Sequence, residues 1–557
     1  MKLQSREAFR SGGTISNSAK RLLRNILPFF LVLMSPVSGM SQPSKTSSDA
    51  TSRFHDWSTY SGGYDGHRFS PLQQITPQTI DRLSMRWIFP VPGANRLQVT
   101  PIVRAGTMYV SDRNSVFALD ARSGRQVWRF SRPLRKDIIS GDARAGINRG
   151  VAVWKDRIFF LTQDAHLLAL HAANGSLIWE SELADRREGY GGTMAPLVVG
   201  DKVIVGTSGG DEGVRGLLDA FDASSGKRLW RFWTVPAPGE PGSETWKGNA
   251  IDHGCGATWL TGTFDPQLNL LYWTTGNPCP DFYGGERIGD NLYTDSVVAL
   301  DIETGRLRWY YQYTPHDTHD WDATQIPVLV DASFNGIPRK LLVQANRNGF
   351  FYVLDRTNGK LLLAKPFVKK LNWAKGIGSD GRPQVLPDTD PSPQGNRVCP
   401  GVVGATNWFS PSYNPKTGLL YVIAMEQCEL YMSSTKGYEK GKGFEGTGSQ
   451  RIPADSGEKF LRAIDIQSGN LRWEYPLVGE GESWAGTLAT AGGIVFFGDD
   501  SGYLAAVSAD AGKPLWHFNT GAQRLSASPM TFAIDGDQYI SFAAGQNILT
   551  FSLLKSE

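Results

Sequence analysis

A short pattern that recurs along the chain constrains the fold more than any other feature. An apolar stretch, usually followed by Asp, leads into a turn that ends in Gly, and a Trp stands four residues beyond that Gly. Five copies match well: VFALDARSGRQVWRF (116–130), LLALHAANGSLIWES (167–181), LLDAFDASSGKRLWRFW (217–233), VVALDIETGRLRWYY (297–311) and LRAIDIQSGNLRWEY (461–475). Two weaker copies are FYVLDRTNGKLLLAK (351–365), where Leu363 replaces the Trp, and LAAVSADAGKPLWHF (504–518). Such repetition indicates an array of similar units.

Each copy predicts a β-hairpin. The Asp can cap the turn, the Gly supplies a positive φ, and the Trp offers a large apolar ring to hold one sheet against the next. Gly124, Gly175 and Gly226 follow one another at intervals of 51 residues, which is enough for a four-stranded antiparallel sheet. A ring of such sheets is an all-β fold, the β-propeller.

Two longer gaps interrupt the repeats, from Gly226 to Gly305 and from Gly359 to Gly469. They indicate insertions, or a degenerate blade near YNPKTGLLYVIAM (413–425). Insertions on one face of a repeat protein often carry its function.

Composition narrows the class of protein. The 557 residues are 40% hydrophobic and include 62 glycines, as in a turn-rich chain that can bury a large core. The net charge is only +3, and basic residues form no extended stripe. We therefore do not expect a nucleic-acid partner, and the sequence sets no oligomeric state.

The N-terminus resembles a secretory signal. Lysines and arginines precede the apolar run ILPFFLVLM (26–34), and small residues follow it. We expect a signal peptide over 1–40, a flexible leader over 41–53 and a single propeller domain over 54–557. The expected location is the periplasm, without stable membrane insertion; a retained membrane anchor is the alternative.

Four cysteines are present: Cys255, Cys279, Cys399 and Cys428. No CxxC or CxxCH motif occurs, so the sequence predicts neither a zinc ribbon nor a covalently attached c-type haem. In an oxidising compartment we expect disulfides between 255 and 279 and between 399 and 428. Each would close a loop of about 25–30 residues and contribute roughly 3–4 kcal/mol. Free buried thiols are the alternative.

The stretch PHDTHDWDAT (315–324) concentrates histidines and carboxylates. A zinc site built on His316 and His319 is one hypothesis, although neither a helical pattern nor a nearby cysteine supports it. A catalytic base with supporting groups is the second, and a structural polar loop is the third.

Further motifs stand between the repeats. They are NRGVAVW (148–154), GTMAPLVVGDKVIVGTSGGDEGVRG (192–216), ATWLTGTFDPQLNLLYWTTGNP (257–278), NRNGFFYVLDR (346–356), ATNWFSPSYNPKTG (405–418) and WAGTLATAGG (484–493). With the repeats, they closely resemble the quinoprotein alcohol dehydrogenases related to methanol and ethanol dehydrogenase, from residue 56 to residue 554. The resemblance implies an eight-bladed propeller whose eighth blade joins the two ends of the chain. It also implies pyrroloquinoline quinone (PQQ) and a metal ion on the central axis.

The resemblance assigns cofactor-binding residues one by one. Arg149 and Thr193 would contact acidic groups of PQQ, Trp259 would stack beneath the quinone plane, and Arg347 would lie beside the reactive carbonyl. The remaining contacts would be Gly209, Gly210, Asn407, Trp408 and Trp484. These residue types suit PQQ, because it carries three carboxylates and a flat electrophilic quinone.

The resemblance also assigns the metal ligands and the base. Asp211, Asn277 and Asp320 match metal-binding positions, and Asp320 matches the catalytic carboxylate that takes the substrate's hydroxyl proton, with Arg347 as its catalytic partner. Asp322 is a fourth candidate ligand. An extra Asp at this position accompanies lanthanide in methanol dehydrogenases, but quinoprotein dehydrogenases that use divalent ions also carry it. Calcium and lanthanide both remain open.

Several positions depart from the family pattern. Ala143 and Arg144 stand where many members have adjacent, disulfide-bonded cysteines. Gln98, Ala257 and Asp211 replace a common Glu, Thr and Glu, and His319 replaces the usual Trp before the catalytic Asp. Cys399 and Cys428, by contrast, match a structural disulfide of the family. The departures leave the geometry of quinone binding and the substrate class open.

Two functions follow as hypotheses. The first is an exported PQQ-dependent dehydrogenase of an alcohol, or of a sugar or polyol, whose electrons leave to a separate acceptor such as a cytochrome c. The second is a non-catalytic propeller that serves as a binding or assembly scaffold. The matching Asp211, Asn277, Asp320 and Arg347, and a signal region without a lipobox cysteine, favour the enzyme.

Overall fold

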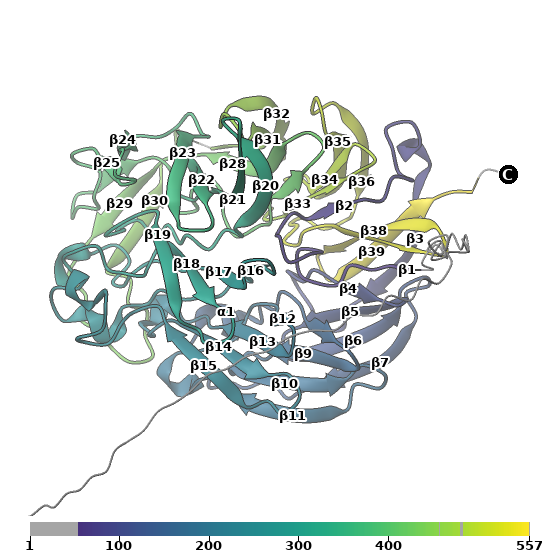
Figure 1. The fold of residues 1–557 in the computed structure, drawn as a ribbon, viewed down its shortest axis with the longest axis horizontal. Coiled ribbons are helices and arrows are strands. Elements are labelled where there is room, and N and C mark those ends of the chain that lie inside the picture. Colours follow the sequence, from purple (N-terminus) through teal and green to yellow (C-terminus); the bar gives the residue numbers. More distant parts are fainter. Residues whose placement is uncertain (1–53, 456, 480–482, 556–557) are drawn as a thin grey trace, which may run out of the picture. The chain divides into compact units, whose positions relative to one another are not determined.

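Eight sheets of four or five strands make up most of the described chain (Figure 1). The computed structural model describes residues 54–455, 457–479 and 483–555, and these residues fall within one compact unit. The expected signal peptide (1–40) and leader (41–53) lie outside the described residues. The sheets are the blades of a propeller, numbered below in chain order, and the predicted eight-bladed all-β fold is confirmed.

Five blades are uninterrupted four-stranded antiparallel sheets. Blade 1 contains β4 (Ile102–Arg104), β5 (Thr107–Asp112), β6 (Ser115–Asp120) and β7 (Gln126–Ser131). Blade 2 contains β8 (Ala152–Trp154), β9 (Arg157–Leu161), β10 (His166–His171) and β11 (Leu177–Glu182). Blade 3 contains β12 (Leu197–Val199), β13 (Lys202–Gly206), β14 (Leu217–Asp222) and β15 (Arg228–Trp233). Blade 4 contains β16 (Thr263–Asp265), β17 (Leu270–Thr274), β18 (Ser296–Asp301) and β19 (Leu307–Gln312). Blade 5 contains β20 (Val328–Phe334), β21 (Ile337–Ala345), β22 (Phe350–Asp355) and β23 (Lys360–Pro366).

The other three blades draw on distant segments. Blade 6 contains β27 (Ser412–Asn414), β28 (Leu419–Glu426), β31 (Glu458–Asp465) and β32 (Leu471–Leu477). Blade 7 contains β33 (Thr487–Thr490), β34 (Ile494–Gly498), β35 (Tyr503–Ser508) and β36 (Pro514–Asn519), with β2 (Phe69–Ser70) parallel to β33. Blade 8 contains, in spatial order, β1 (Phe54–His55), β37 (Met530–Ile534), β38 (Asp537–Ala544), β39 (Asn547–Leu553) and β3 (Leu83–Pro90).

Residues outside the blades form small sheets and short helices. The small sheets are β24 (Ala374–Ile377) with β25 (Pro383–Val385), and β26 (Asn396–Val398) with β29 (Glu429–Ser433) and β30 (Thr447–Arg451). The helices are α1 (Gly141–Ala145) and the 3-10 turns η1 (Ile80–Arg82), η2 (Arg186–Glu188), η3 (Gly210–Glu212), η4 (Ser243–Thr245), η5 (Ala250–His253) and η6 (Gly284–Glu286). Within the described ranges, no helix has the length and apolar character needed to cross a bilayer.

The two gaps in the repeat are insertions. The segment 413–425 is not a degenerate blade of its own, because it forms β27 and β28, the first half of the blade whose second half carries the Gly469 repeat. Strands β29 and β30 are inserted between those halves. The other gap holds long connections on either side of β16 and β17.

The tryptophan repeat docks each blade onto the next one. A Cβ added at Gly305 would lie 2.6 Å from the ring of Trp230, so that ring lies directly over the turn of the neighbouring blade. The Trp230 indole Nε1 also donates to the carbonyl of Ile302, at 2.9 Å, three residues before the Gly. The same ring-on-glycine contact recurs at Trp87 on Gly124, Trp128 on Gly175, Trp179 on Gly226, Trp309 on Gly359 and Trp473 on Gly512. Leu363 takes this place on Gly469.

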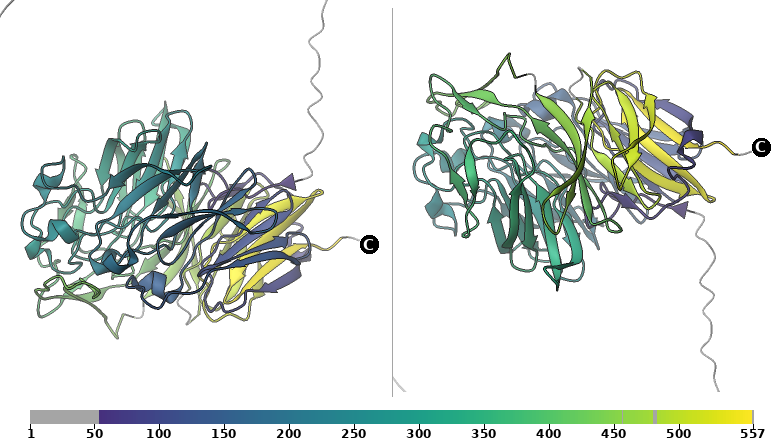
Figure 2. Two further views of the ribbon diagram at one scale, coloured as in Figure 1. Left: turned by 90° about the horizontal axis from the view of Figure 1, so that it is seen from below. Right: turned by 90° about the horizontal axis from the view of Figure 1, so that it is seen from above.

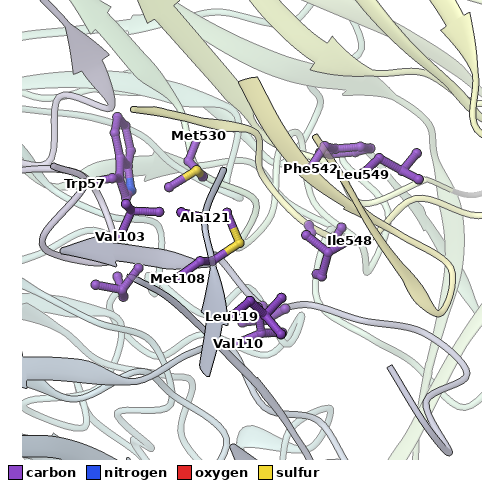
Figure 3. Close-up of a cluster of buried hydrophobic side chains, with 14 of the residues drawn as sticks. Trp57, Val103, Met108, Val110, Leu119, Ala121, Met530, Phe542, Ile548 and Leu549 are labelled. Carbon is purple, nitrogen blue, oxygen red and sulfur yellow. The ribbon is translucent and has the colours of Figure 1, made fainter. Parts of the chain in front are cut away.

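Blade 8 closes the ring. Its outer strand β3 carries Trp87, which docks on Gly124 of blade 1, while Trp516 of blade 7 packs edge-on against Phe551 of blade 8, with ring centroids 5.6 Å apart. Figure 2 shows β1 and β3 beside β37–β39. The interface between blades 8 and 1 is filled by buried side chains such as Met108, Leu119 and Phe542 (Figure 3).

Candidate active site

A cavity of about 410 Å³ lies among the connections at one face of the propeller. Because successive strands in a blade are antiparallel, connections between blades and those between a blade's second and third strands emerge at the same face. The residues that line the cavity come from these connections and from the β3–β4 loop. They are Arg96, Gln98, Ser140, Gly141, Asp142, Arg149, Ser208, Gly209, Gly210, Asp211, Glu212, Ala257, Trp259, Asn277, Asp320, Asp322, Arg347, Val402, Val403, Asn407, Trp408, Trp484 and Arg524.

The structure brings nearly all of the predicted site residues to this cavity. The cofactor-binding and metal-binding candidates all line it, with Thr193 as the exception. Thr193 lies behind the wall, where its Oγ1 accepts a hydrogen bond from Arg149 Nη1 at 3.0 Å. Thr193 therefore orients Arg149 here.

Arg149 lies between two indole rings. Its guanidinium carbon is 4.8 Å from the centroid of Trp259 and 4.7 Å from that of Trp408. The side chain is buried, and burial lowers the pKa of Arg149. A guanidinium stacked in this way remains a charged, planar donor on the cavity wall.

Three groups from adjacent blades meet at Asp322. Its Oδ2 accepts a hydrogen bond from Arg347 Nη1 at 2.7 Å, and its Oδ1 lies 3.2 Å from the Asn277 backbone N and 3.4 Å from Trp259 Nε1. Asp320 Oδ2 is 3.8 Å from Arg347 Nη2. Asp320 has a left-handed backbone, with φ of +57°, a conformation that Asp tolerates better than most residues and that often marks functional sites.

Three carboxyl groups that line the cavity have raised pKa values. Burial raises the pKa of Asp320 well above its usual range, although Arg347 opposes the shift. Asp211 is exposed to the cavity although it lies deep in the protein, and burial, aided by Glu212 and Asp142, raises its pKa to about 7. Burial likewise raises the pKa of Glu212 to about 6. Several carboxylates with raised pKa values around one cavity favour binding of a cation, because a positive charge stabilises their ionised forms.

The histidines of PHDTHDWDAT are structural supports. His316 Nδ1 hydrogen-bonds to the Gly289 carbonyl at 2.8 Å, and His319 Nε2 to the Thr389 carbonyl at 2.7 Å. His319 also stacks on Trp321, with ring centroids 4.2 Å apart. Since the two rings bond to different segments, the zinc hypothesis fails.

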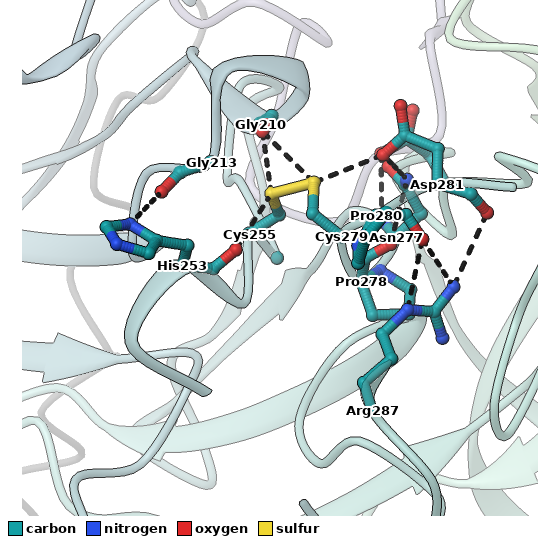
Figure 4. Close-up of a disulfide and its surroundings, with 12 residues drawn as sticks. Gly210, Gly213, His253, Cys255, Asn277, Pro278, Cys279, Pro280, Asp281 and Arg287 are labelled. Carbon is teal, nitrogen blue, oxygen red and sulfur yellow. Dashed lines mark hydrogen bonds between the residues drawn. A yellow bond between two sulfur atoms is a disulfide. The ribbon is translucent and has the colours of Figure 1, made fainter. Parts of the chain in front are cut away.

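Both expected disulfides are present. Cys255 and Cys279 are joined with their Cα atoms 5.4 Å apart, and Cys399 and Cys428 with theirs 4.3 Å apart. The Gly210 carbonyl oxygen lies 2.6 Å from Cys255 Sγ and 3.2 Å from Cys279 Sγ (Figure 4). The first disulfide thus contacts the turn that carries Asp211, and its Cys279 lies two residues after Asn277.

The cavity also has lining residues that the sequence did not single out. Glu212 accepts a hydrogen bond from the Gly141 backbone N at 2.7 Å, which ties α1 to the Asp211 turn. The others are Arg96, Ser140, Gly141, Asp142, Ser208, Val402, Val403 and Arg524. The acidic pair in GGDEG was the one local signal, because Glu212 directly follows a predicted ligand.

The wall fits a quinone with several carboxylates. Arg149 Nε is buried without a hydrogen-bond partner among the described residues and can donate to a carboxylate, and the Trp259 indole lines the same cavity. Arg347 Nε is buried and unpartnered in the same way. Orphaned polar atoms on a cavity wall mark positions where a ligand can supply the missing partners.

The same wall supplies hard oxygen donors. Asp211, Asp320 and Asp322 line the cavity together with the Asn277 amide and Arg347. Calcium and lanthanide ions take such ligands. The donors do not form a closed shell: nowhere in the described ranges do three His, Cys, Asp or Glu side chains converge for a metal, and Asp322 is paired with Arg347.

Comparison with known proteins decides the family. The PQQ glucose/ethanol/alcohol dehydrogenase β-propeller domain matches residues 57–365 and 461–540. The quinohemoprotein alcohol dehydrogenase ADH IIB of Pseudomonas putida is 38% identical over 515 residues, which cover 88% of this chain and 73% of that protein. The chain belongs to the PQQ-dependent alcohol dehydrogenases.

Two further relatives support the assignment. The quinoprotein alcohol dehydrogenase PedH of Pseudomonas putida is 37% identical over 515 residues, covering 87% of this chain and 85% of that protein. A europium-containing methanol dehydrogenase superposes with a TM-score of 0.82 at 29% identity. The match covers 90% of this chain and 98% of the methanol dehydrogenase chain. This PQQ-dependent dehydrogenase is an enzyme whose cofactor is PQQ.

Proposed function

We propose that this dehydrogenase is exported and that it oxidises the hydroxyl group of an alcohol, in the broad class that includes sugars and polyols. In this proposal the electrons then leave to a separate acceptor such as a cytochrome c. The cysteines of the described residues are all in disulfides, so none of these is available to attach a haem. One observation carries the proposal: Asp320 shares a cavity wall with Arg347, Trp259 and the oxygen donors Asp211, Asn277 and Asp322.

In this proposal Asp320 is the general base. It accepts the proton of the substrate hydroxyl, while a C–H bond of the carbon that bears this hydroxyl breaks and a carbonyl forms. PQQ, when bound, supplies the acceptor for the hydride, and hence for the two electrons.

The other residues would hold the quinone and the cation and stabilise the charge that develops in the reaction. Arg347 places positive charge where negative charge develops. Arg149, with Gly209, Gly210, Asn407, Trp408 and Trp484, would hold the quinone above Trp259, and Thr193 would hold Arg149. Asp211, Asn277, Asp320 and Asp322 would bind the cation.

The central test is reconstitution. Full-length protein freed of metal receives PQQ with calcium or with lanthanum, and alcohols and sugars are screened with an electron-accepting dye. Asp320→Asn should lower turnover by about 10²–10⁴-fold and leave PQQ binding, followed by absorbance, intact. Asp156→Asn, at an exposed turn outside the cavity, is the control. Normal turnover in Asp320→Asn would refute the base assignment, and absence of PQQ binding with every metal would refute the function.

Metal choice, export and electron transfer have their own tests. Activity with calcium but none with lanthanum would refute a lanthanide role for Asp322. Export predicts that protein from a periplasmic extract begins near residue 41, as read by N-terminal sequencing. A separate acceptor predicts that the substrate-reduced enzyme reduces cytochrome c in stopped flow.

A further inference from the structure

The amide of Asn277 is held in one orientation. Its Nδ2 donates to Asp281 Oδ1 at 2.8 Å and approaches the Pro278 carbonyl at 3.4 Å. Both partners are acceptors, so the nitrogen must face them, and the opposite flip of the amide would place oxygen against oxygen. Oδ1 accepts no hydrogen bond from any described residue and remains available to a ligand.

Asp281 lies behind the cavity wall. Asn277 lines the cavity, whereas Asp281 does not, and Asp281 is only 2% exposed. Asp281 Oδ1 and the Pro278 carbonyl oxygen both lie beside the amide nitrogen, so the Asn277 Oδ1 atom points away from them.

The loop that carries Asp281 is itself fixed. Cys279 Sγ lies 3.1 Å from Asp281 Oδ1, and the buried Arg287 donates through Nη2 to the Pro280 carbonyl at 2.8 Å (Figure 4). The same Nη2 donates to the carbonyl of Asp317 at 2.6 Å. Arg287 therefore ties the Asp281 loop to the loop that carries Asp320.

We propose that Asp281 is a positioning residue for the cation site, holding the Asn277 amide so that Oδ1 serves as a ligand. The inference rests on the proposed function, in which Asn277 binds the cation. Partners of this kind, one bond removed from a metal, change metal affinity by roughly 10–100-fold when removed.

The test measures cation affinity directly. Full-length protein with PQQ, freed of metal, is titrated with Ca²⁺ or Tb³⁺ by calorimetry. Asp281→Ala should weaken binding about 10–100-fold. Asp281→Asn should weaken binding less, because its side-chain oxygen can still accept the hydrogen bond from Asn277 Nδ2. The control is Asp290→Asn in the same insertion. Asp290 does not line the cavity and forms an ion pair with Arg382, with 2.7 Å between the two side chains, so this substitution should leave the cation affinity unchanged.

A double-mutant cycle separates this role from a structural one. In an Asn277→Ala background, Asp281→Ala and Asp281→Asn should change affinity less than twofold, because the residue acts through Asn277. Additive losses there, or Asp281 variants that bind like the parent while Asn277→Ala binds weakly, would overturn the inference alone. If Asn277→Ala itself binds like the parent, the ligand assignment in the proposed function fails as well. Should Asp281→Ala not fold, Asp281→Asn carries the cycle.

Discussion

Replacing Gly305 by Ala tests how the blades are joined. Gly305 has φ of +68°, and an added Cβ would lie 2.6 Å from the ring of Trp230. Two costs therefore add. A left-handed backbone costs an L-residue about 1–2 kcal/mol, and overpacking against the indole costs about 1–3 kcal/mol.

Gly336 offers a matched control. It has φ of +77° in the turn between β20 and β21, but an added Cβ there would have no atom within 4 Å. Gly336→Ala should thus show the backbone cost alone. The difference between the two variants isolates the Trp230 contact and should be about 1–3 kcal/mol.

The assay is equilibrium urea unfolding of full-length protein, followed by circular dichroism and by tryptophan fluorescence. Gly305→Ala should unfold at lower urea than Gly336→Ala and should alter the folded-state fluorescence. Equal destabilisation by the two substitutions would show that the Trp230 ring can shift without cost. That result would refute the contact between Trp230 and Gly305 as a source of stability at the interface between blades.

Three other predictions follow from the site and the core. Arg149→Lys keeps the charge but loses the planar stack between Trp259 and Trp408, so PQQ affinity, measured by fluorescence quenching, should fall about tenfold, which is about 1.4 kcal/mol; unchanged affinity would contradict the stacking role. Removing either disulfide by paired Cys→Ser substitution should lower the free energy of unfolding by about 2–4 kcal/mol. Calorimetry should show weaker cation binding only when Cys255 and Cys279 are replaced, because that disulfide contacts the Asp211 turn. Equal effects of the two pairs on cation binding would contradict this role. Burial raises the pKa of Asp112 from 3.8 to about 6, so the folded protein binds this proton more tightly than the unfolded chain, and stability should fall as pH rises through that window. Asp112→Asn should remove this fall and add about 1–3 kcal/mol at pH 7, whereas an unaltered pH profile in urea unfolding would refute it.

The propeller was predictable because its signal is local. In each repeat the turn glycine and the tryptophan lie on one hairpin, and their partners are the same residues in the next copy. Blade 8 has no such signal. Its strands come from both ends of the chain, and although Trp87 docks like the others, Leu83 rather than Gly precedes it by four residues. The resemblance, rather than the pattern, supplied the eighth blade.

The site was predictable where a motif names a residue and not where only packing does. Asp211, Asn277 and Asp320 stand in recognisable segments, and all three reach the cavity. Thr193 was expected on the wall but lies behind it, because its hydroxyl binds Arg149. Asp281 and Arg287 act through the direction of one side chain and a few backbone carbonyls, which no linear pattern encodes.

Blade 8 imposes an order of events on folding. Strands β1 and β3 pair only with β37 and β39, so two strands from the first described residues have exposed edges until residues 530–553 exist. Arg68, which donates to the carbonyls of Tyr60 and Pro529 at 2.7 Å, waits for the same late segment. Arg524, on the cavity wall, comes just before it. The cavity is therefore complete only once residues 524–553 have been made, and the quinone is enclosed by a propeller whose first and last strands are already paired.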